Sequence, residues 1–130
     1  MNFDDWKNKY YPVPAYSETL DSDIKRIEHS IIKWSGAKKD VLKDYSLKYD
    51  DHFIFSDGDC EEMVFALDTC ALCVKYGVTC TSIDGVPCPI VRATGSNCDS
   101  VYNISDYDPQ PMIDLLENTL EFVKHEGDGE

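Results

Sequence analysis

The chain has 130 residues, with 12 Lys and Arg against 25 Asp and Glu, and a formal net charge of −13 at pH 7. Hydrophobic residues make up 42% of it, which is enough to build a core in one domain and excludes general disorder. No apolar stretch reaches the roughly 18 residues of a membrane span. The first six residues lack the basic start and apolar run of a secretory signal, so we expect a cytoplasmic protein in a reducing environment.

The charge is unevenly distributed along the chain. Residues 1–49 carry nine basic and eight acidic residues, whereas residues 50–130 carry three and seventeen. The acidic part should repel nucleic acid, whose binding depends on cations at phosphates, and should attract a basic protein surface. Acidity that serves only solubility is the alternative. The candidate partner-binding carboxylates are Asp57, Asp59, Glu61, Glu62, Asp99, Asp106 and Asp108.

The first 16 residues are aromatic and interrupted by proline. The run Tyr10-Tyr11-Pro12-Val13-Pro14 disfavours a helix because proline restricts the residue before it. We therefore expect an extended arm over residues 1–16, packed on its own domain or on a partner. Residues 17–126 should form one globular domain.

Residues 17–36 show the clearest helical pattern of the chain. The apolar residues at spacings of four and three place one stripe on a helix face: Leu20, Ile24, Ile27, Ile31 and Trp34. Ser17 or Asp21 can cap the start, and Gly36 can end the helix. A second helix is expected over residues 38–47. We expect the lysines of both helices to lie on a solvated face and His29 to be a surface residue.

A short β-hairpin should follow the two helices. Residues 52–55 are a predicted strand, and the buried run at 63–67 fits either a strand or a helix. A hairpin across the Asp57-Gly58 turn is the preferred interpretation. Asp108-Pro109 should start a C-terminal helix that ends near Lys124, followed by an acidic tail at 127–130. The predicted fold class is α+β: two N-terminal helices, the hairpin, a loop-rich module over residues 68–105 and the C-terminal helix.

Five cysteines lie within the loop-rich module: Cys70, Cys73, Cys80, Cys88 and Cys98. Cys70-Ala71-Leu72-Cys73 is a C-x-x-C turn that can supply two ligands to zinc, which binds four in a tetrahedron. Four of the five thiols are therefore candidate ligands of a structural zinc ion that holds the module together. Reduced buried cysteines and disulfides are the alternatives, and Cys60 is interpreted as a small core residue. Lys75 and Arg92 would offset the charge of four thiolates.

The motifs of several enzyme classes are missing from the sequence. It lacks the zinc deaminase signature, H-E-x-x-H, the Walker A loop, G-x-G-x-x-G and G-x-S-x-G. Its acidic runs do not have the spacing of an EF-hand. We therefore expect no enzymatic activity.

The order of several motifs resembles a family of small uncharacterised proteins encoded by bacteriophages and prophages. The segments that carry the resemblance are Ile27-Glu28-His29-Ser30-Ile31-Ile32-Lys33-Trp34, the C-x-L-C turn at 70–73, and the later residues Cys80, Cys88-Pro89-Ile90, Thr94-Gly95 and Cys98. The family keeps two residues between its third and fourth cysteines, whereas this chain has seven. The resemblance implies a viral accessory protein in the cytoplasm of an infected bacterium.

Three functions follow from these observations as hypotheses. The first is an accessory protein that binds and inhibits a host factor, such as a nucleic-acid-handling defence protein, through its acidic surface. The second is a binder that sequesters a small nucleotide signal. The third is a zinc-dependent enzyme.

Overall fold

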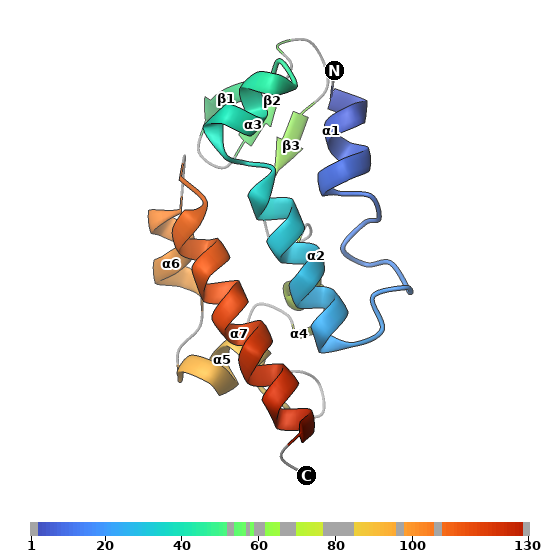
Figure 1. The fold of residues 1–130 in the computed structure, drawn as a ribbon, viewed down its shortest axis with the longest axis vertical. Coiled ribbons are helices and arrows are strands. Elements are labelled where there is room, and N and C mark those ends of the chain that lie inside the picture. The colour runs from blue at the N-terminus through green and yellow to red at the C-terminus, as the bar shows by residue number, and fades with distance from the viewer. Residues whose placement is uncertain are drawn as a thin grey trace.

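The computed structural model describes residues 3–51, 54–56, 58, 62–65, 70–76, 85–95, 98–105 and 108–128. Helices and a small antiparallel sheet make up this part of the chain, which confirms the α+β fold class. Figure 1 shows the sheet, α1 and α3 at one end of the molecule, and the long helices α2 and α7 side by side below them.

The N-terminal segment contains helix α1 (Phe3–Tyr10), so the prediction of an extended arm is wrong for these residues. Phe3, Trp6 and Tyr10 are spaced by three and four residues and therefore share a helix face. Trp6 is 0% exposed, and its indole Nε1 donates a hydrogen bond of 2.8 Å to the Gly36 carbonyl oxygen. Pro12 and Pro14 each restrict the residue before them, and both of those residues lie after α1. The prolines therefore end the helix and do not prevent it.

Helix α2 (Asp23–Ser35) begins later than predicted, because Ser22 is its cap. The Ser22 hydroxyl oxygen accepts a hydrogen bond of 3.2 Å from the Lys25 amide. Gly36 follows the helix without adopting a left-handed conformation. A Cβ atom at Gly36 would lie 2.6 Å from Tyr10 Cγ, so glycine is required here for the close approach of α1.

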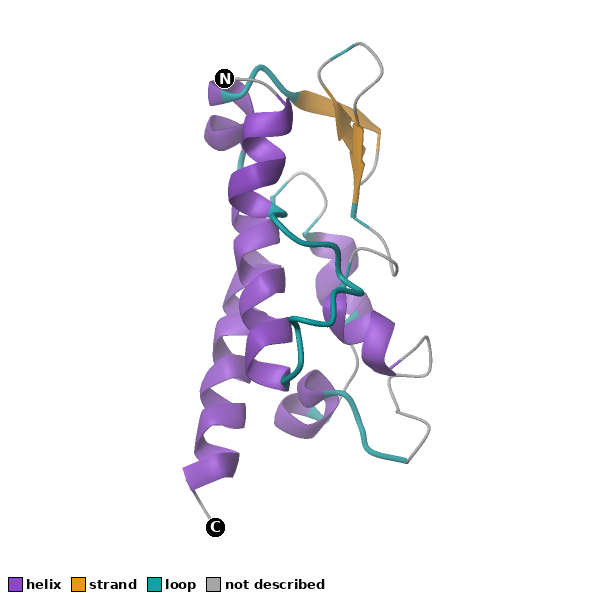
Figure 2. Ribbon diagram, turned by 90° about the vertical axis from the view of Figure 1, so that its right-hand side faces the viewer, coloured by secondary structure: helices purple, strands orange, loops and turns teal. Residues whose placement is uncertain are grey.

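Helix α3 (Lys39–Asp44) leads into a sheet of three strands in the order β1-β2-β3. The strands are β1 (Lys48–Asp51), β2 (Ile54–Ser56) and β3 (Glu62–Val64). β2 and β3 form the predicted hairpin, in which Phe55 pairs with Met63. The sequence pattern did not identify β1. Figure 2 shows the sheet as a small separate layer against one end of the helices.

Four aromatic residues, here called the aromatic cluster, connect the sheet to α1 and α2: Trp6, Trp34, Phe55 and Phe65. The ring centroids of Trp6 and Phe55 lie 5.0 Å apart, and those of Trp34 and Phe65 lie 4.7 Å apart. Phe55 and Phe65 complete the chain of contacts at 5.5 Å. All three pairs meet edge to face, which is a favourable arrangement for aromatic rings.

The C-terminal part is more helical than predicted. Three short helices occupy the described part of the module expected to be loop-rich: α4 (Ala71–Tyr76), α5 (Pro89–Thr94) and α6 (Asp99–Ile104). Helix α7 (Gln110–Asp128) runs four residues past its predicted end, into the expected acidic tail. Its start is as predicted, because Asp108 accepts a hydrogen bond of 3.2 Å from the Gln110 amide. In the described part of the chain, every helix falls short of the length and apolarity needed to cross a membrane.

Candidate functional site

Four of the five candidate cysteines lie in the described part of the chain. Cys70 precedes α4, Cys88 precedes α5 and Cys98 precedes α6. Cys73 lies in the first turn of α4, three residues after Cys70, and therefore on the same side of that turn. The fifth candidate, Cys80, is outside the described residues, and so is Cys60.

The four described cysteines line one small cavity of about 20 Å³. Leu72, Tyr76 and Ile90 supply the rest of its described lining. The volume is enough for one water molecule, or for an ion of smaller size. The fold therefore brings cysteines from the starts of three short helices, distant in sequence, to the walls of one cavity.

Cys70 and Cys73 interact with each other at this cavity. A hydrogen bond with the Cys73 thiol lowers the pKa of Cys70 and outweighs burial, which acts in the opposite direction. The ammonium group of Lys33 lowers the pKa of Cys70 further. A thiol that loses its proton readily is suited to metal binding, because the thiolate is the form that coordinates.

The four thiols do not form a ready-made coordination shell. Within the described residues, no three Cys, His, Asp or Glu side chains form a group that could hold a metal ion as they stand. Four thiols are a donor set that suits zinc, but the described side chains do not form a complete site. Metal binding would require a rearrangement of the cysteine side chains.

Arg92 does not serve the thiols as the sequence suggested. Its guanidinium donates hydrogen bonds of 3.0 and 3.1 Å to Glu126 and one of 3.2 Å to Asp23. The Tyr76 hydroxyl donates to the same Asp23 carboxylate at 2.8 Å. Burial opposes the charge on Arg92, but the hydrogen bonds, led by that to Glu126, raise its pKa above the ordinary value. This network connects α2, α4, α5 and α7. Lys75, the other cation of the cysteine region, is exposed.

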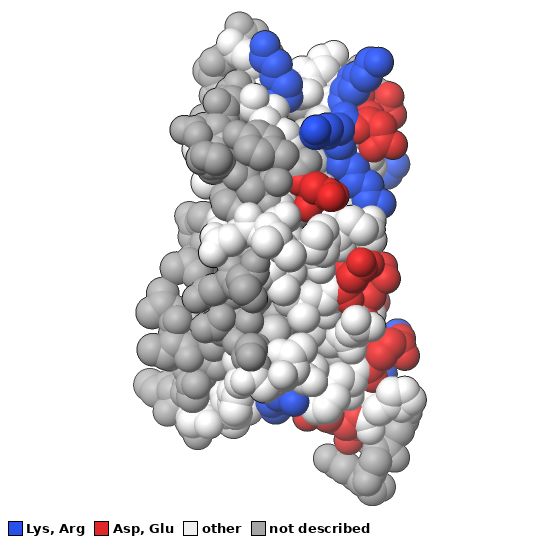
Figure 3. Space-filling model, turned by 90° about the vertical axis from the view of Figure 1, so that its left-hand side faces the viewer, with Lys and Arg blue, Asp and Glu red and all other residues white. Residues whose placement is uncertain are grey.

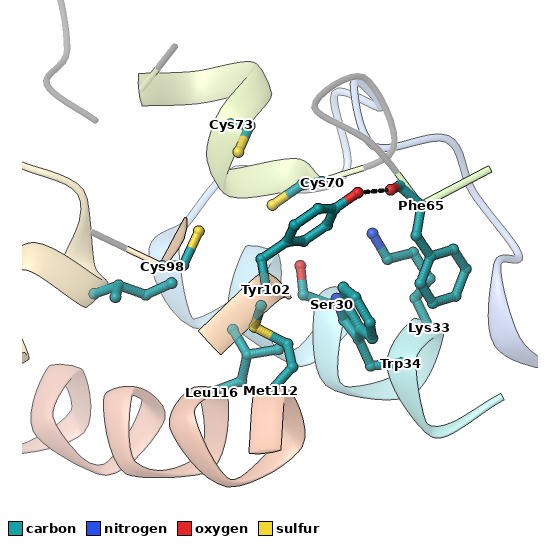
Figure 4. Close-up of a pocket in the computed structure, with 11 residues that line it drawn as sticks. Ser30, Lys33, Trp34, Phe65, Cys70, Cys73, Cys98, Tyr102, Met112 and Leu116 are labelled. Carbon is teal, nitrogen blue, oxygen red and sulfur yellow. Dashed lines mark hydrogen bonds between the residues drawn. The ribbon is translucent and has the colours of Figure 1, made fainter. Parts of the chain in front are cut away.

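A second and larger cavity, of about 200 Å³, adjoins the small one. Cys70, Cys73 and Cys98 line both cavities, whereas Cys88 lines only the smaller. Figure 4 shows the larger cavity enclosed by side chains of α2, α4, α6 and α7. The Tyr102 hydroxyl donates a hydrogen bond to the Phe65 carbonyl oxygen at its edge.

Two polar residues of α2 in the larger cavity were not identified from the sequence. Lys33 is 1% exposed, so the prediction of a solvated lysine face is wrong for this residue. Its Nζ lies 4.8 Å from the centroid of the Phe65 ring. Ser30 is also 1% exposed, and its hydroxyl has no hydrogen-bond partner within the described part of the chain. Ser30 and Lys33 are neighbours of Trp34 on the surface of α2. Because Trp34 was predicted to face the core, its position could have indicated that these two side chains also face inward.

His29 is buried, so the prediction that it is a surface residue is also wrong. Its Nε2 lies 2.8 Å from the Val13 carbonyl oxygen, and its ring packs against Tyr11. Burial lowers the pKa of His29, and the hydrogen bond with Val13 opposes this effect. His29 therefore holds the proline-containing segment against α2.

The candidate partner-binding carboxylates are mostly beyond what the structure describes. Asp57, Asp59, Glu61 and Asp106 are outside the described residues, and only the backbone is described for Glu62 and Asp99. Asp108 is exposed and caps α7. The exposed face of α7 adds acidic residues that the sequence analysis did not list: Asp114, Glu117 and Glu121. Figure 3 shows acidic side chains down one side of the molecule and most of the visible basic ones near the end that holds the sheet.

Comparisons of the chain with protein-family models, with curated proteins and with solved structures gave no match.

Proposed function

We propose that the chain is a non-enzymatic binding protein whose cysteine region holds one structural zinc ion. The observation that carries the proposal is the small cavity shared by the thiols of Cys70, Cys73, Cys88 and Cys98. Four thiols are a complete ligand set for structural zinc. The lowered pKa of Cys70 supports metal binding, because less free energy is then needed to remove its proton.

Zinc content of the purified protein and of single Cys→Ser variants tests this proposal. We expect one zinc ion per chain in the wild type and loss of zinc in C70S, C73S, C88S and C98S. Cys60→Ser, at the cysteine interpreted as a small core residue, is the matched control and should keep the metal, and Cys80→Ser tests whether the fifth candidate takes part. Because a variant can fail to fold, cobalt substitution of the wild type provides a second readout: four thiolates give intense charge-transfer absorption. Protein that is purified without zinc, and whose unfolding transition is the same with and without a strong chelator, would contradict the proposal.

The second part of the proposal concerns the partner. The excess of acidic residues after position 49 favours a basic protein surface, such as that of a host defence protein that handles nucleic acid. The resemblance of the motif order to phage proteins supports an accessory role in the cytoplasm of an infected bacterium. The protein would then occupy a surface that normally binds nucleic acid and so inhibit the host factor.

Salt dependence of the complex tests the electrostatic part of this idea. A partner purified from host lysate should bind strongly at low salt and dissociate steeply as salt rises. The triple variant D114N/E117Q/E121Q removes three exposed charges from α7 and should weaken binding, whereas D40N/D44N changes two exposed carboxylates on α3 and should change it less. An affinity that is independent of salt would rule out the acidic surface as the determinant.

A further inference from the structure

Cys70 and Cys73 are in contact on one turn of the chain. The Cys70 sulfur accepts hydrogen bonds from the Cys73 thiol and from the backbone amides of Leu72 and Cys73. The Val74 amide donates a hydrogen bond of 3.0 Å to the Cys70 carbonyl oxygen, which places both cysteines on the first turn of α4. Cα atoms three residues apart on a helical turn are separated by about 5 Å, and a disulfide spans this distance. The two sulfurs can therefore join without a large movement of the backbone.

The same two thiols are open to a small reactant. Cys70 and Cys73 are partly exposed, whereas Cys88 is 5% exposed. The described lining of the larger cavity, of about 200 Å³, includes Cys70 and Cys73 but not Cys88. A small uncharged molecule in this cavity therefore meets the C-x-x-C pair before it meets Cys88.

Ser30 presents an unpartnered polar atom to this cavity. The residue is 1% exposed, and its hydroxyl has no hydrogen-bond partner within the part of the chain that the structure describes. Figure 4 shows the hydroxyl directed from α2 toward Cys70 and Tyr102. Buried side-chain hydroxyls are generally hydrogen-bonded, so this one indicates a polar group of a bound molecule. A hydroxyl both donates and accepts, which suits a small molecule with O–H groups.

We propose that a hydroperoxide in this cavity oxidises Cys70 and Cys73 to a disulfide, that Ser30 positions the peroxide, and that the disulfide releases the zinc ion. This inference rests on the proposed zinc ion, because it assigns a means of regulation to that same site. Zinc binds cysteine as the thiolate, which is also the form that attacks a peroxide. The ligand set therefore holds the metal and supplies the nucleophile.

The reaction needs hydrogen peroxide or an organic hydroperoxide as the oxidant. The Cys70 thiolate attacks one peroxide oxygen, the O–O bond breaks, hydroxide leaves and Cys70 becomes a sulfenic acid. The Cys73 thiolate then attacks the Cys70 sulfur, the S–S bond forms and a second hydroxide leaves. Two electrons pass from the sulfurs to the peroxide, and two protons from solvent convert the hydroxides to water. Two of the four thiolate ligands are then lost, and the zinc ion dissociates.

Hydrogen peroxide added to the zinc-loaded protein, after removal of reductant, tests the proposal. A chromogenic zinc indicator should report one zinc ion released per disulfide formed, and dithiothreitol should reverse the oxidation. Trypsin releases the peptide of residues 49–75, which contains Cys60, Cys70 and Cys73. Its mass should fall by two hydrogen atoms, and fragmentation should place this loss within residues 70–73.

Matched variants separate the roles of the residues. Cys98→Ser removes a thiol that lines both cavities but lies outside the pair, so it should still form the disulfide even where it has lost zinc. Cys73→Ser should instead leave a sulfenic acid at Cys70 that dimedone traps. Ser30→Ala should keep its zinc and slow the oxidation about two- to tenfold, the contribution of one hydrogen bond. Ser35→Ala, on the same helix but outside the described lining of the cavity, should react like the wild type.

The outcomes distinguish this inference from the proposed function. Purified protein without zinc would contradict the proposed function, and the mass of the 49–75 peptide would still decide whether Cys70 and Cys73 form a peroxide-sensitive pair. Zinc that stays bound in peroxide, or that leaves without a disulfide between Cys70 and Cys73, would overturn the inference and leave the proposed function intact. Equal oxidation rates in S30A and S35A would overturn the role of Ser30.

Discussion

Trp6, Trp34, Phe55 and Phe65 fill one region of the molecule with edge-to-face contacts at 4.7 to 5.5 Å, whereas four cysteines in the other region surround cavities. The aromatic cluster connects a sheet to two helices through direct ring contacts. The cysteine region consists of short helices that meet around unfilled space. Ring packing holds the first region, together with the hydrogen bond from the Trp6 indole to Gly36, and a ligand that bound in the second region would stabilise it.

The largest expected effect is at the aromatic cluster. Trp6→Ala removes a side chain that is 0% exposed and should lower the free energy of unfolding by about 3–5 kcal/mol. Urea unfolding followed by circular dichroism measures this loss. Val74→Ala, at a position that is 45% exposed in the cysteine region, is the control and should cost less than about 0.5 kcal/mol. A W6A variant as stable as the wild type would show that the cluster is not the stabilising contact.

Zinc removal should be the next largest effect, and it should be confined to the cysteine region. If zinc is present at about a hundred times its dissociation constant, chelation should lower the free energy of unfolding by about 2.7 kcal/mol. Hydrogen exchange should then accelerate in α4, α5 and α6, while β2 and β3 keep their protection. Equal acceleration in both regions would contradict the separation drawn between them.

The Arg92 network should contribute less. Arg92→Ala removes the contacts of Arg92 with Asp23 and Glu126, while Arg26 and Tyr76 still contact Asp23, so it should cost about 0.5–1.5 kcal/mol. Thermal or urea unfolding measures the loss. Lys25→Ala removes an exposed ion pair with Asp21 on the same helix and should give no measurable change, because solvent screens such a pair. Equal losses of unfolding free energy in R92A and K25A would contradict the idea that burial makes the Arg92 network more stabilising than an exposed ion pair.

The smallest expected effect is a pH dependence at His29. Burial lowers its pKa in the folded state, so the unfolded chain binds the proton more readily. Stability from this group is therefore complete above about pH 6.5, the unfolded value, and falls as the pH drops toward the folded pKa. His29→Gln should flatten this part of the stability curve measured between pH 7.5 and 5.5, whereas exposed His125→Gln should not. An unchanged slope in H29Q would assign the pH dependence to other groups.

The sequence predicted those features that depend on periodicity or on local spacing. The apolar stripe of α2 placed Ile27 and Trp34 inside, and both are buried. The Asp108-Pro109 start of α7 was also predicted, because a helix cap is a local signal. The Asp57-Gly58 turn predicted the pairing of β2 with β3. The sequence analysis assigned no strand to β1, which pairs with β2.

Features that depend on tertiary contacts were missed or misplaced. The helices α4, α5 and α6 are six residues each, which is too short for a reliable periodic pattern. Lys33 is buried beside the rings of Phe65 and Trp34, and residue type alone argues against that position. The sequence analysis did group Cys88 and Cys98 with Cys70 and Cys73 as candidate ligands of one site, and these four cysteines line one cavity.

The pairing of α2 with α7, the most extensive between two elements in the described part of the chain, also has a consequence for synthesis on the ribosome. Helix α2 ends at Ser35, and its partner begins at Gln110. At about 5–20 residues per second, a nascent chain would wait on the order of 4–15 s between emergence of the two helices. During this interval the surface of α2 that contacts α7 would be open to chaperones and to neighbouring polypeptides, and completion of the last helix would end that exposure.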